Sequence, residues 1–132
     1  MFFQYETPRL LLKVLRADCA PQVLDFYNRD KELFEMYEID RMPDFYTVKH
    51  LQKVLRYEYS MAVKSQLFRF YVFKKENPCR IIGTVCIHNI APAFYGSCEI
   101  GYKFSSEFHH MGYATEAVGF CTKLAFSFAC TR

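Results

Sequence analysis

The residues best suited to chemistry lie in one stretch of this 132-residue chain, the loop from His109 to Ala114. Gly112 stands where a helix must begin, and a helix start leaves backbone N–H groups unpaired that attract anions, phosphate above all. A glycine there can adopt a conformation closed to other residues and let a ligand approach the main chain. The loop is therefore a candidate phosphate site, although a single glycine is more typical of an ordinary turn before a helix.

The residues on either side of this loop predict a strand before it and a helix after it. From Cys98 to Phe104, apolar residues alternate with Glu99, Gly101 and Lys103, which is typical of a strand buried on one face. After Gly112 the apolar residues recur three and four positions apart, which predicts an amphipathic helix of about four turns. Its apolar positions are Ala114, Ala117, Val118, Cys121, Leu124, Ala125 and Phe128.

The wording EIGY, a short loop and GYATEA resembles the acetyl-CoA-binding segment of the GNAT N-acetyltransferases, in particular the branch of ribosomal-protein N-terminal acetyltransferases. That family carries Gln or Arg, two residues, Gly, one residue, then Gly or Ala, and its backbone amides bind the CoA pyrophosphate. Gly112 and Ala114 match this pattern, and His109 replaces the usual Gln or Arg. The resemblance implies that acetyl-CoA is bound by Gly101, Tyr102, Lys103, His109, His110, Met111, Gly112, Tyr113, Ala114 and Thr115.

Acetyl transfer to an amine needs a polarised carbonyl, a neutral amine and a proton for the departing sulfur. Strand amides around Tyr102 and Lys103 are candidates for the first task. Glu99 is the candidate base, because it shares a strand face with Gly101 and Lys103, near where the family places its amine. Glu99 could equally be a solvated residue or a partner of Lys103. His109 and His110 would lie at the pyrophosphate end, too far from the thioester to act as bases.

The rest of the chain predicts the elements that position this site. We expect a first strand from Arg9 to Leu15, a helix capped by Asp18 that runs to about Arg29, and a short helix from Asp30 to Met36. Glu38 to Tyr46 should be loop. Thr47 should begin another helix, followed by strands at Leu67–Phe73 and Arg80–Ile90, with a turn between Pro92 and Gly96.

This order predicts a single α+β domain over residues 1–132. It resembles the first two-thirds of a GNAT domain, whose sheet is mixed, mostly antiparallel and flanked by helices. The chain would then be truncated at its C-terminal side, without the family's next strand and the tyrosine that often acts as general acid. We therefore expect the strand from Cys98 to Phe104 to have an open edge, and the chain to form a homodimer or to associate through that edge or the outer face of the last helix.

Composition excludes several other classes. The chain is 52% hydrophobic and 18% aromatic, which is typical of a packed globular protein. A net charge of +3 with dispersed basic residues argues against nucleic-acid binding. There is no secretory leader and no apolar run long enough for a membrane span, so a cytoplasmic protein is expected. The six cysteines show no metal-binding spacing, so we interpret them as buried, reduced thiols, with zinc as a remote alternative.

Three interpretations of function remain. The chain is an acetyl-CoA-dependent N-acetyltransferase that acts on a primary amine, either a protein N-terminus or a small molecule. Alternatively, it is a CoA-binding module without catalytic competence, or an interaction module that assembles through its sheet edge. The segment with Phe34, Met36, Tyr37, Ile39 and Met42 would meet the acceptor, but its sequence does not identify that acceptor.

Overall fold

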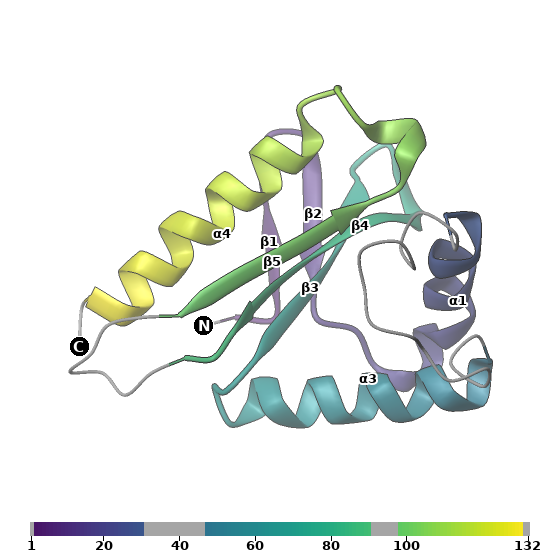
Figure 1. The fold of residues 1–132 in the computed structure, drawn as a ribbon, viewed down its shortest axis with the longest axis horizontal. Coiled ribbons are helices and arrows are strands. Elements are labelled where there is room, and N and C mark those ends of the chain that lie inside the picture. Colours follow the sequence, from purple (N-terminus) through teal and green to yellow (C-terminus); the bar gives the residue numbers. More distant parts are fainter. Residues whose placement is uncertain (1, 31–46, 91–97, 131–132) are drawn as a thin grey trace.

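The computed structural model describes residues 2–30, 47–90 and 98–130. Its five strands form one antiparallel sheet in the order β1-β2-β3-β4-β5, so that each strand lies beside its neighbour in sequence (Figure 1). The strands are β1 (Gln4–Glu6), β2 (Leu10–Lys13), β3 (Phe68–Lys74), β4 (Asn77–His88) and β5 (Glu99–Phe104). β5 is therefore an edge strand of the described sheet.

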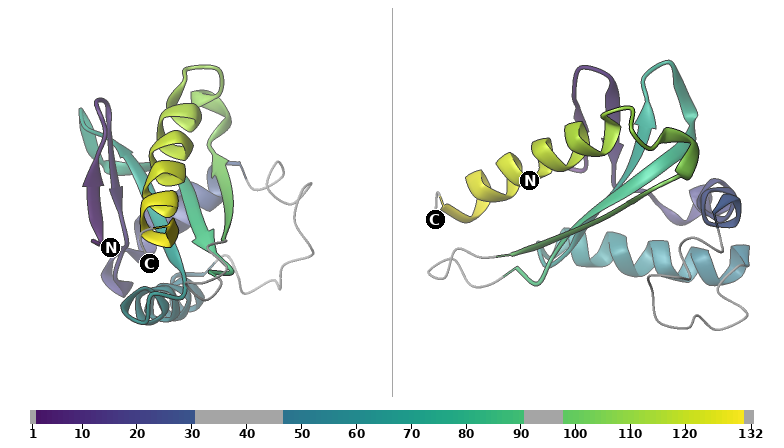
Figure 2. Two further views of the ribbon diagram at one scale, coloured as in Figure 1. Left: turned by 90° about the vertical axis from the view of Figure 1, so that its left-hand side faces the viewer. Right: turned by 45° about the horizontal axis from the view of Figure 1, so that its top comes forward.

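Helices cover both faces of this sheet (Figures 1 and 2). On one face lie α1 (Ala20–Arg29) and α3 (Val48–Val63), with a short 3-10 turn, η1 (Ala17–Cys19), before α1. On the other face lies α4 (Tyr113–Cys130), which follows β5 after a second 3-10 turn, η3 (Ser106–Phe108). α4 runs back alongside β5, so the loop between them brings the start of the helix to the end of the strand.

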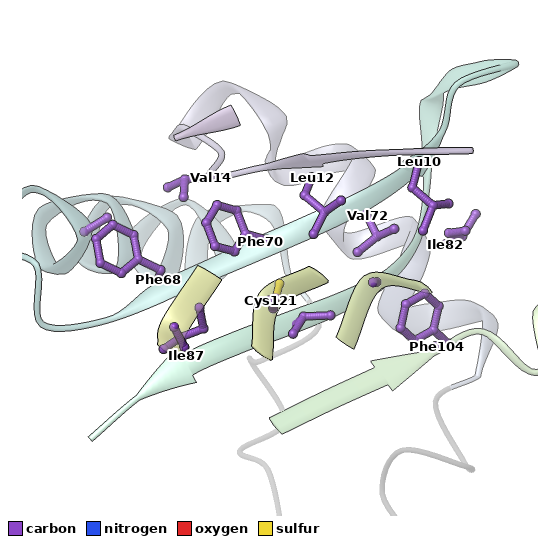
Figure 3. Packing of buried hydrophobic residues seen from close by; sticks show 14 residues of the cluster. Leu10, Leu12, Val14, Phe68, Phe70, Val72, Ile82, Ile87, Phe104 and Cys121 are labelled. Carbon is purple, nitrogen blue, oxygen red and sulfur yellow. The ribbon is translucent and has the colours of Figure 1, made fainter. Parts of the chain in front are cut away.

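The core under α4 is built from apolar side chains of four strands and from the small residues of the helix (Figure 3). Ala117, Cys121 and Ala125 are buried in it, which lets the helix lie close to the sheet. Burial raises the pKa of the Cys121 thiol to about 12, as expected of a core residue rather than a reactive one. Gly83 pairs with Phe104 across the strands, and a Cβ there would lie 2.4 Å from the Phe104 ring. Only glycine leaves room for that ring.

The opposite face combines an apolar cluster with a buried ion pair that the sequence pattern does not predict. Arg69 Nε donates to Glu58 Oε2 over 2.7 Å, and Tyr71 Oη donates to Glu58 Oε1 over 2.8 Å. Burial raises the pKa of Glu58 even beside the Arg69 guanidinium. This ion pair connects α3 to β3. Arg69 also donates a hydrogen bond to the hydroxyl of Thr84 in β4.

The α+β class and the antiparallel sheet flanked by helices are confirmed. The helix from Thr47 is also confirmed, since the Thr47 side chain accepts a hydrogen bond from the His50 amide at the helix start. The cap at Asp18 is wrong, because Asp18 lies inside η1 and α1 has no side-chain cap. β1 was not predicted at all; three residues give too little alternation to recognise.

Other sequence predictions have mixed outcomes. The Asp30 carboxylate accepts hydrogen bonds from the amide and the hydroxyl of Ser106, so it contacts the loop after β5. The short helix and loop predicted up to Tyr46, and the turn between Pro92 and Gly96, lie outside the described residues. The prediction that every cysteine is buried is wrong for Cys79, which is exposed in β4. Within the described ranges, no helix is long and apolar enough to cross a membrane, and no cluster of potential metal ligands is found.

Candidate functional site

A hollow of about 350 Å³ lies between β5 and the first half of α4. It is lined by Tyr102, Ala114, Thr115, Val118 and Gly119, three of which are predicted cofactor residues. Tyr102 was expected on the buried face of its strand, yet it is 60% exposed because its side chain borders this hollow. Gly119 also borders the space, and a Cβ placed there would meet no atom within 4 Å.

The loop at one end of the hollow has the geometry of an anion site. Gly112 has φ +81°, the left-handed conformation that favours glycine, and its carbonyl accepts the first helical hydrogen bond, from the Glu116 amide. The amides of Tyr113, Ala114 and Thr115 therefore fall in the first turn of α4, where no intrahelical partner exists. Among the described residues, these three amides have no hydrogen-bond acceptor. These amides and the positive end of the helix dipole face whatever binds there.

A cluster from the N-terminal hairpin holds this helix start in place. Glu116 Oε2 accepts hydrogen bonds from Thr7 Oγ1 and from the Arg9 amide, and Arg9 Nε donates to Glu116 Oε1 over 2.6 Å. The same guanidinium donates to the Met111 carbonyl over 3.1 Å and lies 4.5 Å from the centre of the Tyr113 ring. Arg9 thus binds the loop and the helix together without occupying the free amides.

The two histidines of the loop differ. His109 Nε2 lies 2.9 Å from the Phe104 carbonyl oxygen, so the ring donates back to the end of β5. His110 has φ +66°, which is uncommon for a residue with a side chain, and it is exposed. His109 therefore shapes the loop, while His110 and the exposed Met111 face solvent beside it.

The register of β5 decides which of its amides are free. The Ser105 amide donates to the Ile82 carbonyl, which makes Ser105 a hydrogen-bonded position of the β4–β5 ladder. In an antiparallel pair such positions alternate, so Lys103 and Gly101 also bond to β4, whereas Ile100 and Tyr102 direct their N–H and C=O groups to the open edge. Of the two amides predicted to polarise a carbonyl, only that of Tyr102 is available; the ladder with β4 takes that of Lys103.

Glu99 lies on the face of β5 opposite to the hollow. It shares that face with Lys103, whose Nζ lies 5.4 Å from the centre of the Tyr27 ring of α1. Glu99 contacts His88 and Asn89 rather than Lys103, and its side chain is 66% exposed. Gly101 lies between Glu99 and Lys103, next to the His88 ring. The candidate base and the hollow are therefore on two sides of one edge strand.

Several residues of the site were not predicted. Arg9 and Thr7 are about a hundred residues from Glu116 in sequence. No local pattern could connect them. The sequence did carry one signal, which is Gly119 inside the predicted helix. Glycine destabilises a helix interior, so its presence indicates a position where a side chain would obstruct packing or a ligand.

Comparison with known proteins gives one family. The family model described as Acetyltransferase (GNAT) domain matches residues 9–131. A probable N-acetyltransferase of Bacillus subtilis, YjcK, is 26% identical over 117 residues, which are 89% of this chain and 64% of that protein. The chain thus spans slightly less than two thirds of this curated relative.

Solved structures agree in fold. The ribosomal-protein-S5-alanine acetyltransferase of Vibrio fischeri superimposes with a TM-score of 0.84 at 22% identity, over 94% of this chain and 67% of that one. Mycobacterium smegmatis RimJ, solved with CoA-disulfide, gives a TM-score of 0.80 at 19% identity, over 89% of this chain and 56% of its own. At these identities the likeness concerns the fold.

Proposed function

The chain belongs to the acetyltransferase (GNAT) domain family, and from this premise we propose that it binds acetyl-CoA between β5 and α4 and transfers the acetyl group to a primary amine. The observation that carries the proposal is the continuity of the site. Free first-turn amides at Gly112 lead directly into the hollow beside Tyr102, and the open edge of β5 borders that hollow. A phosphate-bearing, extended ligand fits this succession of features.

In this proposal the amides of Tyr113, Ala114 and Thr115 bind the pyrophosphate, and Gly112 lets it approach the main chain. The hollow accepts the pantetheine arm, since Gly119 leaves its wall open. The outward N–H and C=O groups of Ile100 and the outward C=O group of Tyr102 pair with the amides of that arm in the manner of an added strand. When bound, acetyl-CoA supplies an acetyl group activated as a thioester, from which the CoA thiolate is a good leaving group.

The remaining tasks belong to the chain's own residues at the edge of β5. The outward amide of Tyr102 is placed to donate to the acetyl carbonyl oxygen, where negative charge develops. Glu99, on the other face of the same strand, takes a proton from the acceptor amine, directly or through a water molecule. The amine then approaches from the side of α1 and α3. In this arrangement the cofactor lies on one side of β5 and the acceptor amine lies on the other, beside Glu99.

Binding is the first test. Calorimetry with acetyl-CoA should show binding that weakens as salt rises, because the contact is with charge. Gly112→Val should abolish it, since a branched side chain disfavours the backbone conformation at φ +81° and a Cβ there already lies 3.2 Å from Arg9. His109→Ala is the control and should weaken binding only modestly. Unchanged affinity in the Gly112 variant would refute this phosphate site.

Turnover is the second test. A thiol-release assay over peptides with free N-termini and small amines should identify an acceptor class; the similar structures include enzymes named for ribosomal proteins, so peptides come first. Glu99→Gln should lower turnover by about two to four orders of magnitude and leave acetyl-CoA binding nearly intact. The alternative is a module that binds CoA without catalysis, and it predicts calorimetric binding with no thiol release from any amine.

A further inference from the structure

One oxygen of the Glu99 carboxylate is contacted by two neighbouring side chains, Asn89 and His88. Asn89 Nδ2 donates to Glu99 Oε2 over 2.8 Å, and His88 Nε2 lies 3.2 Å from the same atom. The other oxygen, Oε1, has no hydrogen-bond partner among the described residues. Among the described residues the two oxygens of this carboxylate therefore differ: Oε2 has two partners and Oε1 has none.

The backbone positions the side chains of His88 and Asn89 in two different ways. His88 lies directly opposite Glu99 in the β4–β5 pairing, so the two side chains project from the same face of the sheet. The imidazole lies over Gly101, where a Cβ would be 3.7 Å from its Cε1 atom. Asn89 follows the end of β4 with φ +49°, a left-handed conformation that asparagine tolerates. This turn allows the Asn89 amide to reach back to Glu99.

The surroundings of His88 select its tautomer. Nδ1 is buried and has no hydrogen-bond partner among the described residues. If the ring proton were on Nδ1, a buried N–H donor would be left unsatisfied, and Nε2 would direct a lone pair at a carboxylate. With the proton on Nε2, the ring donates to Glu99 and only an acceptor remains unpaired. The imidazole therefore presents an N–H group, and not a lone pair, to the Glu99 carboxylate oxygen 3.2 Å away.

We propose that His88 and Asn89 are positioning residues that fix the Glu99 side chain so that Oε1 receives the proton of the acceptor amine. This inference depends on the proposed function, because it assumes that Glu99 is the base. In the step concerned, an N–H bond of the acceptor breaks and an O–H bond forms at Oε1. The electron pair left on nitrogen forms the bond to the acyl carbon while the C=O π pair moves onto oxygen, and that pair then returns as the C–S bond breaks and the CoA thiolate leaves. With Asn89 and His88 on Oε2, and no described residue on Oε1, Oε1 is the oxygen left to accept that proton.

Three variants test the proposal, each measured for kcat, for KM of both substrates and for melting temperature. His88→Phe keeps a ring of similar size but removes the donor. Asn89→Gly removes the amide but keeps the left-handed backbone at no steric cost. Each should lower kcat by about tenfold to a hundredfold, the size expected for a misplaced catalytic group. KM for acetyl-CoA and the melting temperature should change little, because the hollow is on the opposite face.

His88→Gln is the matched rescue, since its amide can donate to Glu99 from a similar place, and it should recover much of the lost kcat. If Glu99→Gln lowers turnover while His88→Phe and Asn89→Gly keep the parental kcat, the positioning inference is overturned and the proposed function stands. If Glu99→Gln is fully active, the assignment of the base fails, and the inference fails with it.

A readout independent of activity also decides the contact. Nitrogen-15 NMR of histidine-labelled protein should show the His88 proton on Nε2 in the parent, and a weaker preference in Glu99→Gln. A parent ring protonated on Nδ1 would overturn the inference whether or not the chain turns over. Failure of the proposed function would instead appear as the absence of thiol release with the Nε2 tautomer intact.

Discussion

At the scale of single residues, Glu116 connects the N-terminal hairpin to the start of α4. Burial by itself would raise the pKa of this carboxyl, but the hydrogen bonds from Thr7 and Arg9 and the charge of Arg9 outweigh it and lower the pKa below its ordinary value of 4.5. The same guanidinium binds the Met111 carbonyl beside Gly112. The ionised form of Glu116 therefore stabilises both the fold and the shape of the candidate phosphate loop.

We expect Glu116→Gln to lower the free energy of unfolding at pH 7 by about 1–2 kcal/mol, because the amide loses the charge-assisted bonds and Arg9 is half exposed. A lowered folded-state pKa gives stability that is present above pH 4.5 and is lost as the pH falls through the folded value. The difference between parent and variant should therefore shrink below pH 4.5. Urea unfolding of both at pH 7 and at acid pH measures it, and a difference that does not depend on pH would contradict this account.

The sequence alone was enough to predict the conformation of Gly112, whose φ of +81° is the left-handed one expected. It did not reach Arg9, His88 or Asn89. Each of these acts through a partner on another strand or helix, and the register that brings the partners together is set by the packing of the whole sheet. A residue that contributes its own backbone can be predicted locally, whereas one that contributes a contact cannot.

At the scale of elements, α4 has two functions that make opposite demands on its sequence. It packs Ala117, Cys121 and Ala125 against the sheet, and it borders the hollow with Val118 and Gly119. The helix was predictable because its apolar period is long and regular. β1 was missed because three residues carry no usable period. Asp18 was misassigned because a 3-10 turn, common before an α-helix, precedes α1, so that Asp18 lies inside the turn and not at the start of the helix.

Gly119 separates these two functions experimentally. Gly119→Ala should raise the free energy of unfolding by about 0.5–1 kcal/mol, since alanine is the better helix former and its methyl group meets no atom within 4 Å. Its affinity for acetyl-CoA should stay near that of the parent. Gly119→Leu should keep the helix but fill part of the hollow and weaken acetyl-CoA binding by roughly tenfold or more, about 1.4 kcal/mol. Thermal melts and calorimetry on both variants check this, and tight binding by the leucine variant would place the cofactor elsewhere.

At the scale of the whole molecule, the described sheet ends at β5, with the outward N–H and C=O groups of Ile100 and Tyr102 along its edge. An edge of this kind is a template for another strand. About two helical turns after Gly119 on α4, Phe126 is 70% exposed. Phe120 lies 5.4 Å from Tyr5 of β1, ring centre to ring centre, and is partly buried.

These two surfaces lead us to expect association of the chain, as a homodimer or with another polypeptide at the open edge. Burial of one large apolar side chain contributes roughly 1.5–3 kcal/mol, which is a substantial part of a small domain's stability of about 5–15 kcal/mol. Sedimentation velocity at micromolar concentration should show a dimer. Tyr102→Pro removes an outward N–H where an edge strand tolerates proline and should abolish association through β5; Phe126→Lys should abolish association through the helix. The variant that yields monomers identifies the surface, and a parent that sediments as a single monomer with a cooperative melt would show that neither surface drives assembly.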